Sequence, residues 1–349
     1  MSNRQDCPIT KTENKKKAAR YTAGGFTLVE MMIGAAIFII VILAVLKLLE
    51  ASRDARFTTT ERSEMLRTAR VALDTMGHDI VNAGVSYPNS GAMVPNGLLP
   101  TILGQTYIDS DGVHDFMTPI ISGDGVNTVG SASTDQLSLI FMDNTFNGGN
   151  ALSISSASTS SSWMVINTAQ SGVTNSVCTP GDLFLISGST SSALGWLTGT
   201  SSTDKLVFAN TDPLNINQPS QTNGVLQSVT YPASATRVDW IRYYVNSTGT
   251  LFRRVYGTPT TRIGNGATTS STGFLDTPIA DNVTDLQIKY TLSDNSVVTG
   301  PTFAQYPSIR QVTVTISLQS PDIDRRLNAR ETLSISATFD ARNLGYIER

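Results

Sequence analysis

A long apolar run lies near the amino terminus, and shorter alternating patterns follow it. Between Phe26 and Leu49 the only ionisable residues are Glu30 and Lys47. As a helix this run would extend about 36 Å, which exceeds the hydrocarbon core of a bilayer at about 30 Å. The pattern therefore predicts one membrane-spanning helix.

The helical periodicity continues beyond the apolar run. No proline occurs between Phe26 and Tyr87. Apolar residues recur at spacings of three and four, which is typical of one buried helix face: Leu66, Ala69, Leu73, Met76 and Ile80. We expect one helix from Phe26 to about Ala83, ended by Gly84. Its charged residues predict a polar face that is solvated or lies between subunits: Arg53, Arg56, Arg62, Arg67 and Arg70 alternate with Asp54, Glu61, Glu64 and Asp74.

Downstream of Gly84 the period changes to that of strands. Apolar residues alternate with Thr and Ser from Val312 to Leu318 and again from Leu333 to Phe339, which predicts two half-buried strands. The polar link Ser320–Arg330 suits an antiparallel connection between them. Further strand candidates are Gln136–Met142, Trp163–Asn167, Asp182–Ser187, Lys205–Ala209, Arg237–Val245, Leu251–Tyr256 and Val283–Leu292.

Composition supports this division of the chain. Only 15% of residues are charged, whereas 40% are hydrophobic, so a sizeable core and a strand-rich body are expected. Polar runs predict exposed loops at Ser153–Ser162, Asn210–Asn223 and Gly257–Gly273. We therefore predict an α+β fold, in which a long amino-terminal transmembrane helix continues into a mainly antiparallel β-sheet globular domain, like a lollipop.

The charge distribution predicts an orientation. Residues 1–25 hold six Lys and Arg against Asp6 and Glu13, a net charge of +4. The remainder carries −3 − 4 = −7. A basic segment ahead of an apolar run predicts a cytoplasmic amino end and an extracytoplasmic body. The acidic remainder argues against nucleic acid as a partner.

The residues at the start of the apolar run resemble a known signal. Gly25, then Phe26-Thr27-Leu28-Val29-Glu30 and a long apolar helix, is similar to the class III signal of type IV pilins and type II secretion pseudopilins. A secretory signal would have a shorter apolar region and a cleavage site beyond it. The resemblance implies that prepilin peptidase cuts between Gly25 and Phe26 and that Phe26 is then N-methylated. Glycine suits a peptidase that needs close access to the backbone.

Glu30 is an acid inside an apolar layer, where an unpaired carboxylate is costly. The resemblance implies that it meets the new amine of a neighbouring Phe26 and helps to draw the subunit into a filament. The alternative is a carboxylate that only extends to the headgroups near a helix end. The other partners implied are the lipid bilayer, further pilins or pseudopilins through helix packing, and the inner-membrane assembly platform.

A second resemblance covers more of the chain. ARVALDTMGHDIVNAGV, from Ala69 to Val85, is similar to the corresponding stretch of PilW-type minor pilins. Further pieces recur in the same order: STDQLSLIF, PGDLFLISG, VDWIRYYV, LFRRV, IADNVTDLQIKY and FDARNLG. Many major pilins have a proline at the position of Lys47, so its absence fits a minor subunit.

Candidates for chemistry are few. His78 and His114 are the only histidines and suggest neither a zinc pair nor a triad. Cys7 and Cys178 are the only cysteines, so no disulfide forms within the chain once the leader is cut, and the role of Cys178 is open. Asp109, Asp111 and Asp115 lie beside Gly112, and such carboxylates can bind calcium. The stretch lacks the spacing of an EF-hand, so a solvated acidic turn is the favoured interpretation. We therefore predict no cofactor, and calcium binding is the alternative.

These observations predict three segments. Residues 1–25 are a prepilin leader, residues 26–84 a helix that spans the membrane in its first half, and residues 85–349 an extracytoplasmic β-rich domain. We expect a single-pass protein of the bacterial inner membrane that moves into a pilus or pseudopilus. The leading hypothesis is a PilW-like minor pilin without enzymatic activity. A J-type pseudopilin and a membrane-anchored extracytoplasmic enzyme are the alternatives.

Overall fold

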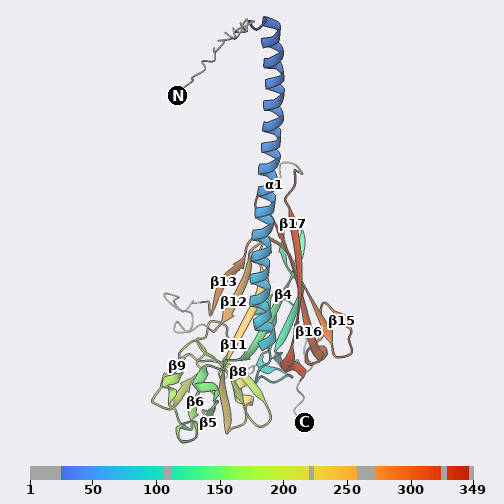
Figure 1. Ribbon diagram of the computed structural model, residues 1–349. Helices are drawn as coiled ribbons and strands as arrows, with labels where there is room; N and C mark the ends of the chain where they lie inside the picture. Colours follow the sequence, from blue (N-terminus) through green and yellow to red (C-terminus); the bar gives the residue numbers. More distant parts are fainter. Residues whose placement is uncertain (1–24, 106–111, 220–223, 258–271, 324–327, 346–349) are drawn as a thin grey trace, which may run out of the picture. The chain divides into compact units, whose positions relative to one another are not determined.

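The computed structural model describes residues 25–105, 112–219, 224–257, 272–323 and 328–345. The chain forms two compact units, Met1–Arg56 and Phe57–Arg349. Helix α1, Leu28–Asn82, has 55 residues and includes the boundary between them (Figure 1). The predicted helix, Phe26 to about Ala83, agrees with these bounds within two residues. Gly84 follows it with φ of +79°, and its N–H donates to Ile140 O at 3.0 Å.

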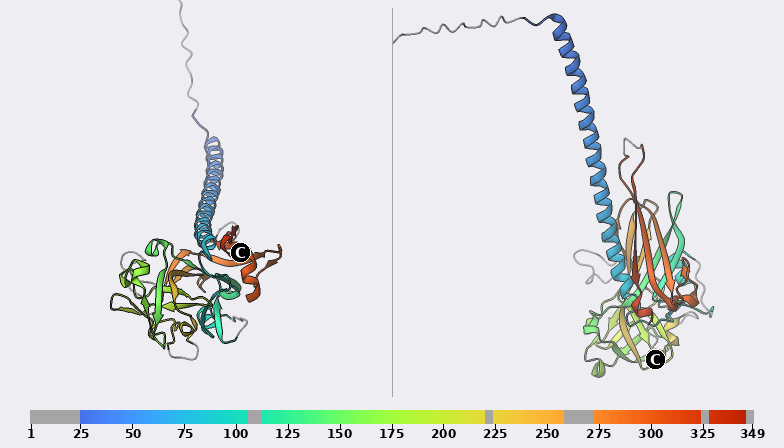
Figure 2. Two further views of the ribbon diagram at one scale, coloured as in Figure 1. Left: turned by 90° about the horizontal axis from the view of Figure 1, so that it is seen from below. Right: turned by 45° about the vertical axis from the view of Figure 1, so that its right-hand side comes forward.

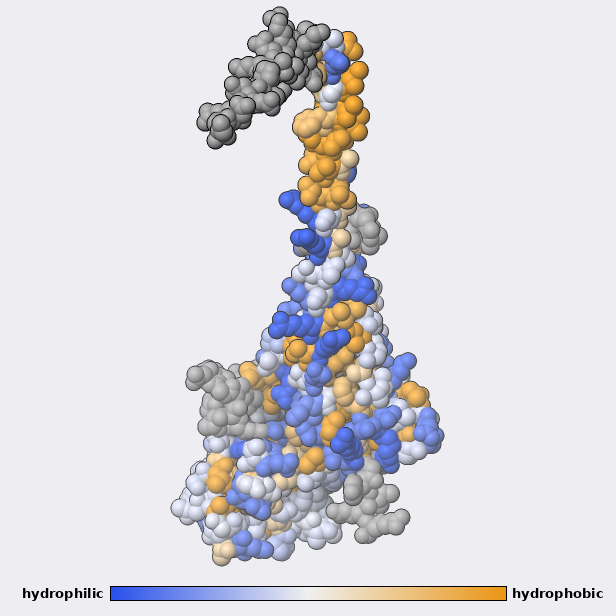
Figure 3. All heavy atoms as spheres, in the orientation of Figure 1, coloured by the Kyte–Doolittle hydropathy of each residue, from blue (hydrophilic) through white to orange (hydrophobic). Residues whose placement is uncertain are grey.

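Most of the described part of the first unit belongs to α1, whose apolar side chains face outward here. Every residue from Gly25 to Glu50 is exposed, and Figure 3 shows this part of the helix as apolar surface. Among the described residues, α1 is the one helix long and apolar enough to cross a membrane. This agrees with the predicted membrane-spanning run.

In the second unit α1 has one buried face. Met65, Ala69, Leu73, Met76 and Ile80 are buried at spacings of three and four, as expected for an amphipathic helix. Leu66, which the periodicity placed on this face, is half-buried. Gly77 lies against the ring of Phe339, and a Cβ added at Gly77 would overlap that ring. The absence of a side chain at Gly77 therefore leaves room for the Phe339 ring beside the helix.

In the described part of the chain, thirteen strands form the larger sheet. Its order is β2-β1-β8-β7-β11-β5-β6-β10-β9, with β4 and β12 also paired to β11. β3 pairs with β4, and β13 pairs with β12. Among the described strands of this sheet, the pairings are antiparallel except that of β1 with β8. The strands are β1 (Ala92–Pro95), β2 (His114–Met117), β3 (Ile120–Val129), β4 (Ala132–Met142), β5 (Leu152–Ala157), β6 (Trp163–Ile166), β7 (Leu183–Ser187), β8 (Ser192–Trp196), β9 (Gly199–Ser201), β10 (Lys205–Val207), β11 (Ala233–Val245), β12 (Leu251–Tyr256) and β13 (Phe274–Ala280).

Strand β11 joins two parts of this sheet. Its first half pairs with β5 and β7, and its second half pairs with β4 and β12. The first half belongs to a second hydrophobic core, which includes Phe146, Phe184 and Phe208. This part gathers at one end of the second unit (Figure 2). Two short helices also occur in the second unit, α2 (Leu98–Leu103) and α3 (Thr168–Ser171).

The smaller sheet has the order β15-β14-β16-β17 and is antiparallel throughout. Its strands are β14 (Val283–Leu292), β15 (Val297–Val298), β16 (Ile309–Gln319) and β17 (Thr332–Asp340). The apolar residues of β16 are fully buried, and those of β17 are half-buried. The outer face carries paired hydroxyls such as Thr315 and Ser336, at 2.7 Å. The predicted antiparallel pair and the α+β fold class are confirmed.

Two of the predicted loops need correction. Ser153–Ala157 belongs to β5, because Leu152 and Ile154 are fully buried and pair this segment with β11 and β6. Only the turn after Ala157 remains of the predicted Ser-rich loop. The loop predicted at Asn210–Asn223 is not simply exposed, since Ile216 and Asn217 are fully buried. Most of the predicted loop at Gly257–Gly273 lies outside the described residues.

Candidate processing and assembly site

The predicted cleavage site lies in the exposed residues just before α1. Gly25, Phe26 and Thr27 precede the first helical residue, Leu28, and Phe26 has an exposed fraction of 84%. A Cβ added at Gly25 would have no atom within 4 Å. In the described part of the chain, neither packing nor a left-handed φ therefore requires glycine at this position. The predicted recognition of Gly25 by a peptidase stays a prediction.

Glu30 caps the helix that carries it. Its Oε2 atom accepts hydrogen bonds from the N–H and the hydroxyl of Thr27, both at 2.9 Å. The hydroxyl oxygen of Thr27 accepts from the N–H of Glu30 at 3.3 Å. These reciprocal bonds form a capping box, which satisfies donors that the first helical turn leaves unpaired. Among the described residues nothing donates to Oε1, so this oxygen is open to a donor from another chain.

The capping role was missed in the sequence reasoning, which considered Glu30 only as an acid in lipid. The signal was present, because a Thr followed three residues later by Glu ahead of an apolar run is typical of a helix start. At the other end of the run, Lys47 Nζ lies 3.1 Å from Glu50 Oε2. Both side chains are exposed, so this ion pair contributes little to stability.

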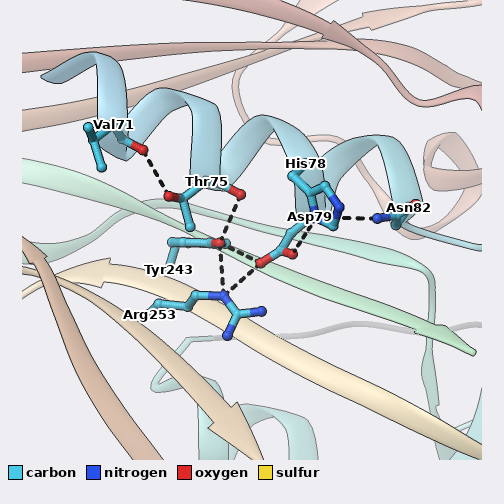
Figure 4. Close-up of polar contacts among 7 residues, drawn as sticks. All are labelled: Val71, Thr75, His78, Asp79, Asn82, Tyr243 and Arg253. Carbon is cyan, nitrogen blue, oxygen red and sulfur yellow. Dashed lines mark hydrogen bonds and ion pairs between the residues drawn. The ribbon is translucent and has the colours of Figure 1, made fainter. Parts of the chain in front are cut away.

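A second polar cluster attaches α1 to the larger sheet (Figure 4). Asp79 on α1 has an exposed fraction of 4%. Its Oδ2 atom accepts from the Tyr243 hydroxyl of β11 at 2.5 Å and from Arg253 Nε of β12 at 2.8 Å. Arg253 Nε also lies 3.2 Å from the Tyr243 hydroxyl oxygen. Three elements therefore meet at one buried carboxylate.

The cluster stabilises one protonation state of Tyr243. Burial, and then the negative charge of Asp79, raises the pKa of the Tyr243 hydroxyl well above its ordinary value. The hydroxyl keeps its hydrogen and donates it to Asp79. A buried carboxylate is tolerated where it is paired and hydrogen-bonded. The arrangement therefore fixes the position of α1 on the sheet.

The predicted calcium ligands are only partly described. Asp109 and Asp111 lie outside the described residues. Asp115 is on β2 with an exposed fraction of 3%, and its carboxylate accepts from the Leu99 N–H at 3.0 Å. Asp115 therefore helps to hold α2 beside β2. In the described part of the chain no group of three or more His, Cys, Asp and Glu side chains is arranged to hold a metal ion.

The remaining candidates have structural surroundings. His78 is exposed on α1, with Nδ1 at 3.5 Å from Asp79 Oδ1. His114 begins β2 and is half-buried. Cys178 is a buried free cysteine, and burial, followed by the nearby Asp182 carboxylate, raises the pKa of its thiol to about 12. The thiol is therefore protonated and unreactive at neutral pH.

Comparison with known proteins identifies the amino end. Residues 20–46 match the family model described as the prokaryotic N-terminal methylation motif. No curated protein matches the chain. The matched segment includes Gly25, Phe26 and Glu30, the exposed start of α1 and most of its apolar run. The chain therefore carries a class III prepilin-type signal, like that of type IV pilins and pseudopilins.

Proposed function

We propose that the chain is a PilW-like minor type IV pilin. Prepilin peptidase cuts it between Gly25 and Phe26, and Phe26 is N-methylated. The product is a single-pass inner-membrane protein whose β-rich unit is extracytoplasmic. It then enters a pilus or primes its assembly. The observation that carries the proposal is the exposed Gly25-Phe26 bond directly ahead of an apolar helix with Glu30 in its first turn.

The exposed apolar part of α1 supports an assembly role. These side chains must be covered by lipid or by other apolar helices, because water disfavours so large an apolar surface. A bilayer covers them before assembly, and neighbouring pilin helices cover them in a filament. Glu30 then has a defined partner in the amine of a neighbouring Phe26, and its Oε1 atom is free to accept it.

The cluster at Asp79 supports the PilW-like assignment. Asp79, Tyr243 and Arg253 lie in three of the sequence pieces that resemble PilW-type proteins: ARVALDTMGHDIVNAGV, VDWIRYYV and LFRRV. The hydrogen bonds that join these pieces give their residues one shared task, the attachment of α1 to β11 and β12. We accordingly propose a structural protein without catalytic activity or cofactor.

A J-type pseudopilin of a type II secretion system is the second candidate, since the same signal and helix serve both systems. Neighbouring genes distinguish the two. A pilus ATPase and minor pilins favour the first, whereas a secretin and a secretion ATPase favour the second.

The intact mass of the exported protein tests the proposal. We expect a chain of 349 − 25 = 324 residues that begins at Phe26 and carries one added methyl group. A Gly25→Leu variant should accumulate uncut in the membrane, although a Cβ at this position has no described atom within 4 Å. An exported chain that retains Met1, or one that begins near Ala51, would refute the proposal.

A further inference from the structure

Strand β17 lies at one edge of the smaller sheet, and among the described strands only β16 pairs with it (Figure 1). It has nine residues and pairs with β16 without a register shift. Its sequence, TLSISATFD, contains no proline, and its one charged residue is Asp340 at the end. The outward N–H and C=O groups of such an edge can pair with another extended backbone.

The other edge strands of the described sheets have features that oppose such pairing. β15 has two residues, β9 has three and β2 has four. β13 contains Asp276 and Pro278, and β3 has a register shift between Gly123 and Asn127. Short strands, prolines, charges and bulges are the usual means by which proteins protect a sheet edge. β17 has none of these features before Asp340, so its edge is open to another strand.

The side chains of β17 indicate what kind of strand fits beside it. On the outer face its hydroxyls pair with those of β16: Thr313 with Thr338 at 2.9 Å, Thr315 with Ser336 at 2.7 Å, and Ser317 with Ser334 at 3.2 Å. On the other face the apolar side chains of β17 are half-buried, whereas those of β16, which has a strand on each side, are fully buried. A strand with hydroxyls on one face and apolar side chains on the other would extend these pairs and cover the remaining apolar surface.

Asp340 adds a negative charge at the carboxyl end of this edge. It is exposed, its Oδ1 atom accepts from Gln311 Nε2 at 3.0 Å, and no cation pairs with it in the described part of the chain. In an antiparallel pairing, which is the arrangement throughout this sheet, the first residues of an added strand lie beside Asp340. A basic residue at that position would complement the charge of Asp340, because opposite charges stabilise a cross-strand pair.

The direction of α1 argues against β17 of a second copy as the added strand. Arg62 on α1 lies 3.7 Å from Glu331, just before β17, and Asn343, just after β17, donates to Val81 O at 2.9 Å. In the second unit α1 and β17 therefore run in the same direction. Antiparallel pairing of two β17 strands would turn the two α1 segments in opposite directions, which chains anchored by α1 in one membrane cannot adopt. Parallel pairing of the same two edges would put the hydroxyl face of one strand on the apolar side of the other.

We propose that β17 binds an extended segment of a different protein as an added antiparallel strand. The segment alternates Ser or Thr with apolar residues, is uncharged in its centre, and has Lys or Arg at its amino end beside Asp340. In this mode of recognition, main-chain hydrogen bonds give the affinity and alternate side chains give the specificity. The exclusion of a second copy rests on the proposed membrane anchor, whereas the open edge itself does not.

A peptide with the sequence KLSISATF tests the contact on the full chain in mild detergent. It copies Thr332–Phe339 with lysine in place of Thr332, and without α1 it is free to lie antiparallel to β17. We expect saturable binding by fluorescence anisotropy, together with slower amide hydrogen exchange within residues 332–340. A scrambled peptide that lacks the alternation should bind about tenfold more weakly or less. Failure of KLSISATF to bind, or equal binding of the scrambled peptide, would overturn the proposal.

Substitutions at the edge provide the sharper test. Ile335→Lys places a charge at a half-buried position of β17 and should weaken binding about tenfold. Val297→Lys, an exposed change on the edge strand β15, is the matched control and should leave binding unchanged. Asp340→Lys should weaken binding of KLSISATF, and the peptide DLSISATF should restore it, because the two charges are then exchanged. Loss without recovery would overturn the placement of the amino end beside Asp340.

Methylation of the peptide amides tests the hydrogen bonds without any change in the protein, so it holds even if a variant fails to fold. It should abolish binding, and undiminished binding would overturn strand addition. A benzoylphenylalanine in place of the last residue of the peptide then locates the site. The antiparallel pairing predicts a crosslink between Glu331 and Ile335, and a crosslink near Phe339 or outside β17 would overturn it.

The outcomes also separate this contact from self-association and from the proposed function. Benzoylphenylalanine at Ile335 of the chain, expressed in cells, should give no crosslink between two copies of β17. A homodimer joined at this edge would assign it to a second copy and overturn the proposal. Peptide binding does not require cleavage at Gly25, which intact mass measures separately. Failure of the peptide to bind would therefore leave the function as a processed pilin untouched, and an uncut chain that binds the peptide would refute only that function.

Discussion

Tyr243 on β11 donates a hydrogen bond to Asp79 on α1 at 2.5 Å, although the two residues are 164 positions apart in the chain. Arg253 donates to the same carboxylate oxygen. Asp79 is buried, and a buried carboxylate is tolerated where it is paired and hydrogen-bonded. The cluster therefore links the helix that carries the processing signal to the β-rich part of the second unit.

The first prediction concerns Asp79. Asp79→Ala should lower the free energy of unfolding by about 3–5 kcal/mol, since it leaves the Arg253 charge partly buried without its partner. Asp74→Ala, an exposed change on the same helix, should alter it by about 0.5 kcal/mol or less. Thermal unfolding of the full chain in mild detergent, followed by near-ultraviolet circular dichroism, measures both. Equal stability of the two variants would show that the cluster contributes nothing.

The second prediction concerns alkaline pH. The pKa of Tyr243 is raised in the folded protein, so its hydroxyl stays protonated while the unfolded chain ionises. Stability from this group is therefore complete below the unfolded pKa of about 10 and falls above it, by about 1.4 kcal/mol per pH unit. Tyr243→Phe should lower stability at neutral pH and flatten the decline between about pH 10 and 11. An unchanged slope in unfolding measured across this range would contradict the assignment.

Local patterns predicted α1, many of the strands and the pairing of β16 with β17, but they did not predict the other contacts between elements. The alternation from Val312 to Leu318 identified β16, and the run from Phe26 identified α1, because burial on one face imposes a period on the sequence. Nothing in such a period pairs Asp79 with Tyr243 or Arg253. The loop predicted at Ser153–Ser162 was wrong over its first residues for a similar reason. Leu152 and Ile154 are two apolar residues among serines, and tertiary pairing with β11 makes this segment a strand.

The third prediction concerns Gly77. Gly77→Ala should lower the free energy of unfolding by about 1–3 kcal/mol, because the new methyl group would overlap the Phe339 ring. This loss should occur although alanine favours a helix more than glycine does. Gly34→Ala is the matched control, since a Cβ there has no atom within 4 Å. Combining Gly77→Ala with Phe339→Leu should restore part of the loss in a double-mutant cycle.

The candidate site depends on local sequence, whereas the contacts inside the fold do not. The residues from Gly25 to Glu30 are adjacent in sequence, so their spacing carries the whole pattern. A groove beside Glu61 is lined by α1, by the turn from β13 to β14 and by the end of β16, and the last two segments are each more than 200 residues from α1 in the chain. Its acidic residues looked like part of an ordinary polar helix face. Only the fold brings Asp281 to the same place.

The last prediction separates the two roles of Glu30. Glu30→Gln keeps an oxygen that accepts from Thr27, so it preserves the helix cap, but it removes the negative charge that would attract a neighbouring amine. Thr27→Val removes the capping hydroxyl and keeps the charge, at a cost of about 1 kcal/mol in helix stability. Glu30→Ala removes both features. All three variants should still be cut after Gly25, because the peptidase recognises the glycine side of the bond.

The ratio of subunit in sheared filaments to subunit in membranes then decides between three explanations. If the charge pairs with the amine of a neighbouring Phe26, Glu30→Gln and Glu30→Ala should be depleted from filaments, and Thr27→Val should enter them. If the cap alone matters, Glu30→Gln should enter normally, whereas Thr27→Val and Glu30→Ala should not. If the carboxylate only extends to the headgroups, all three should enter at the unmutated ratio. We expect the first pattern, because Oε1 is open to a donor while Oε2 is held by Thr27.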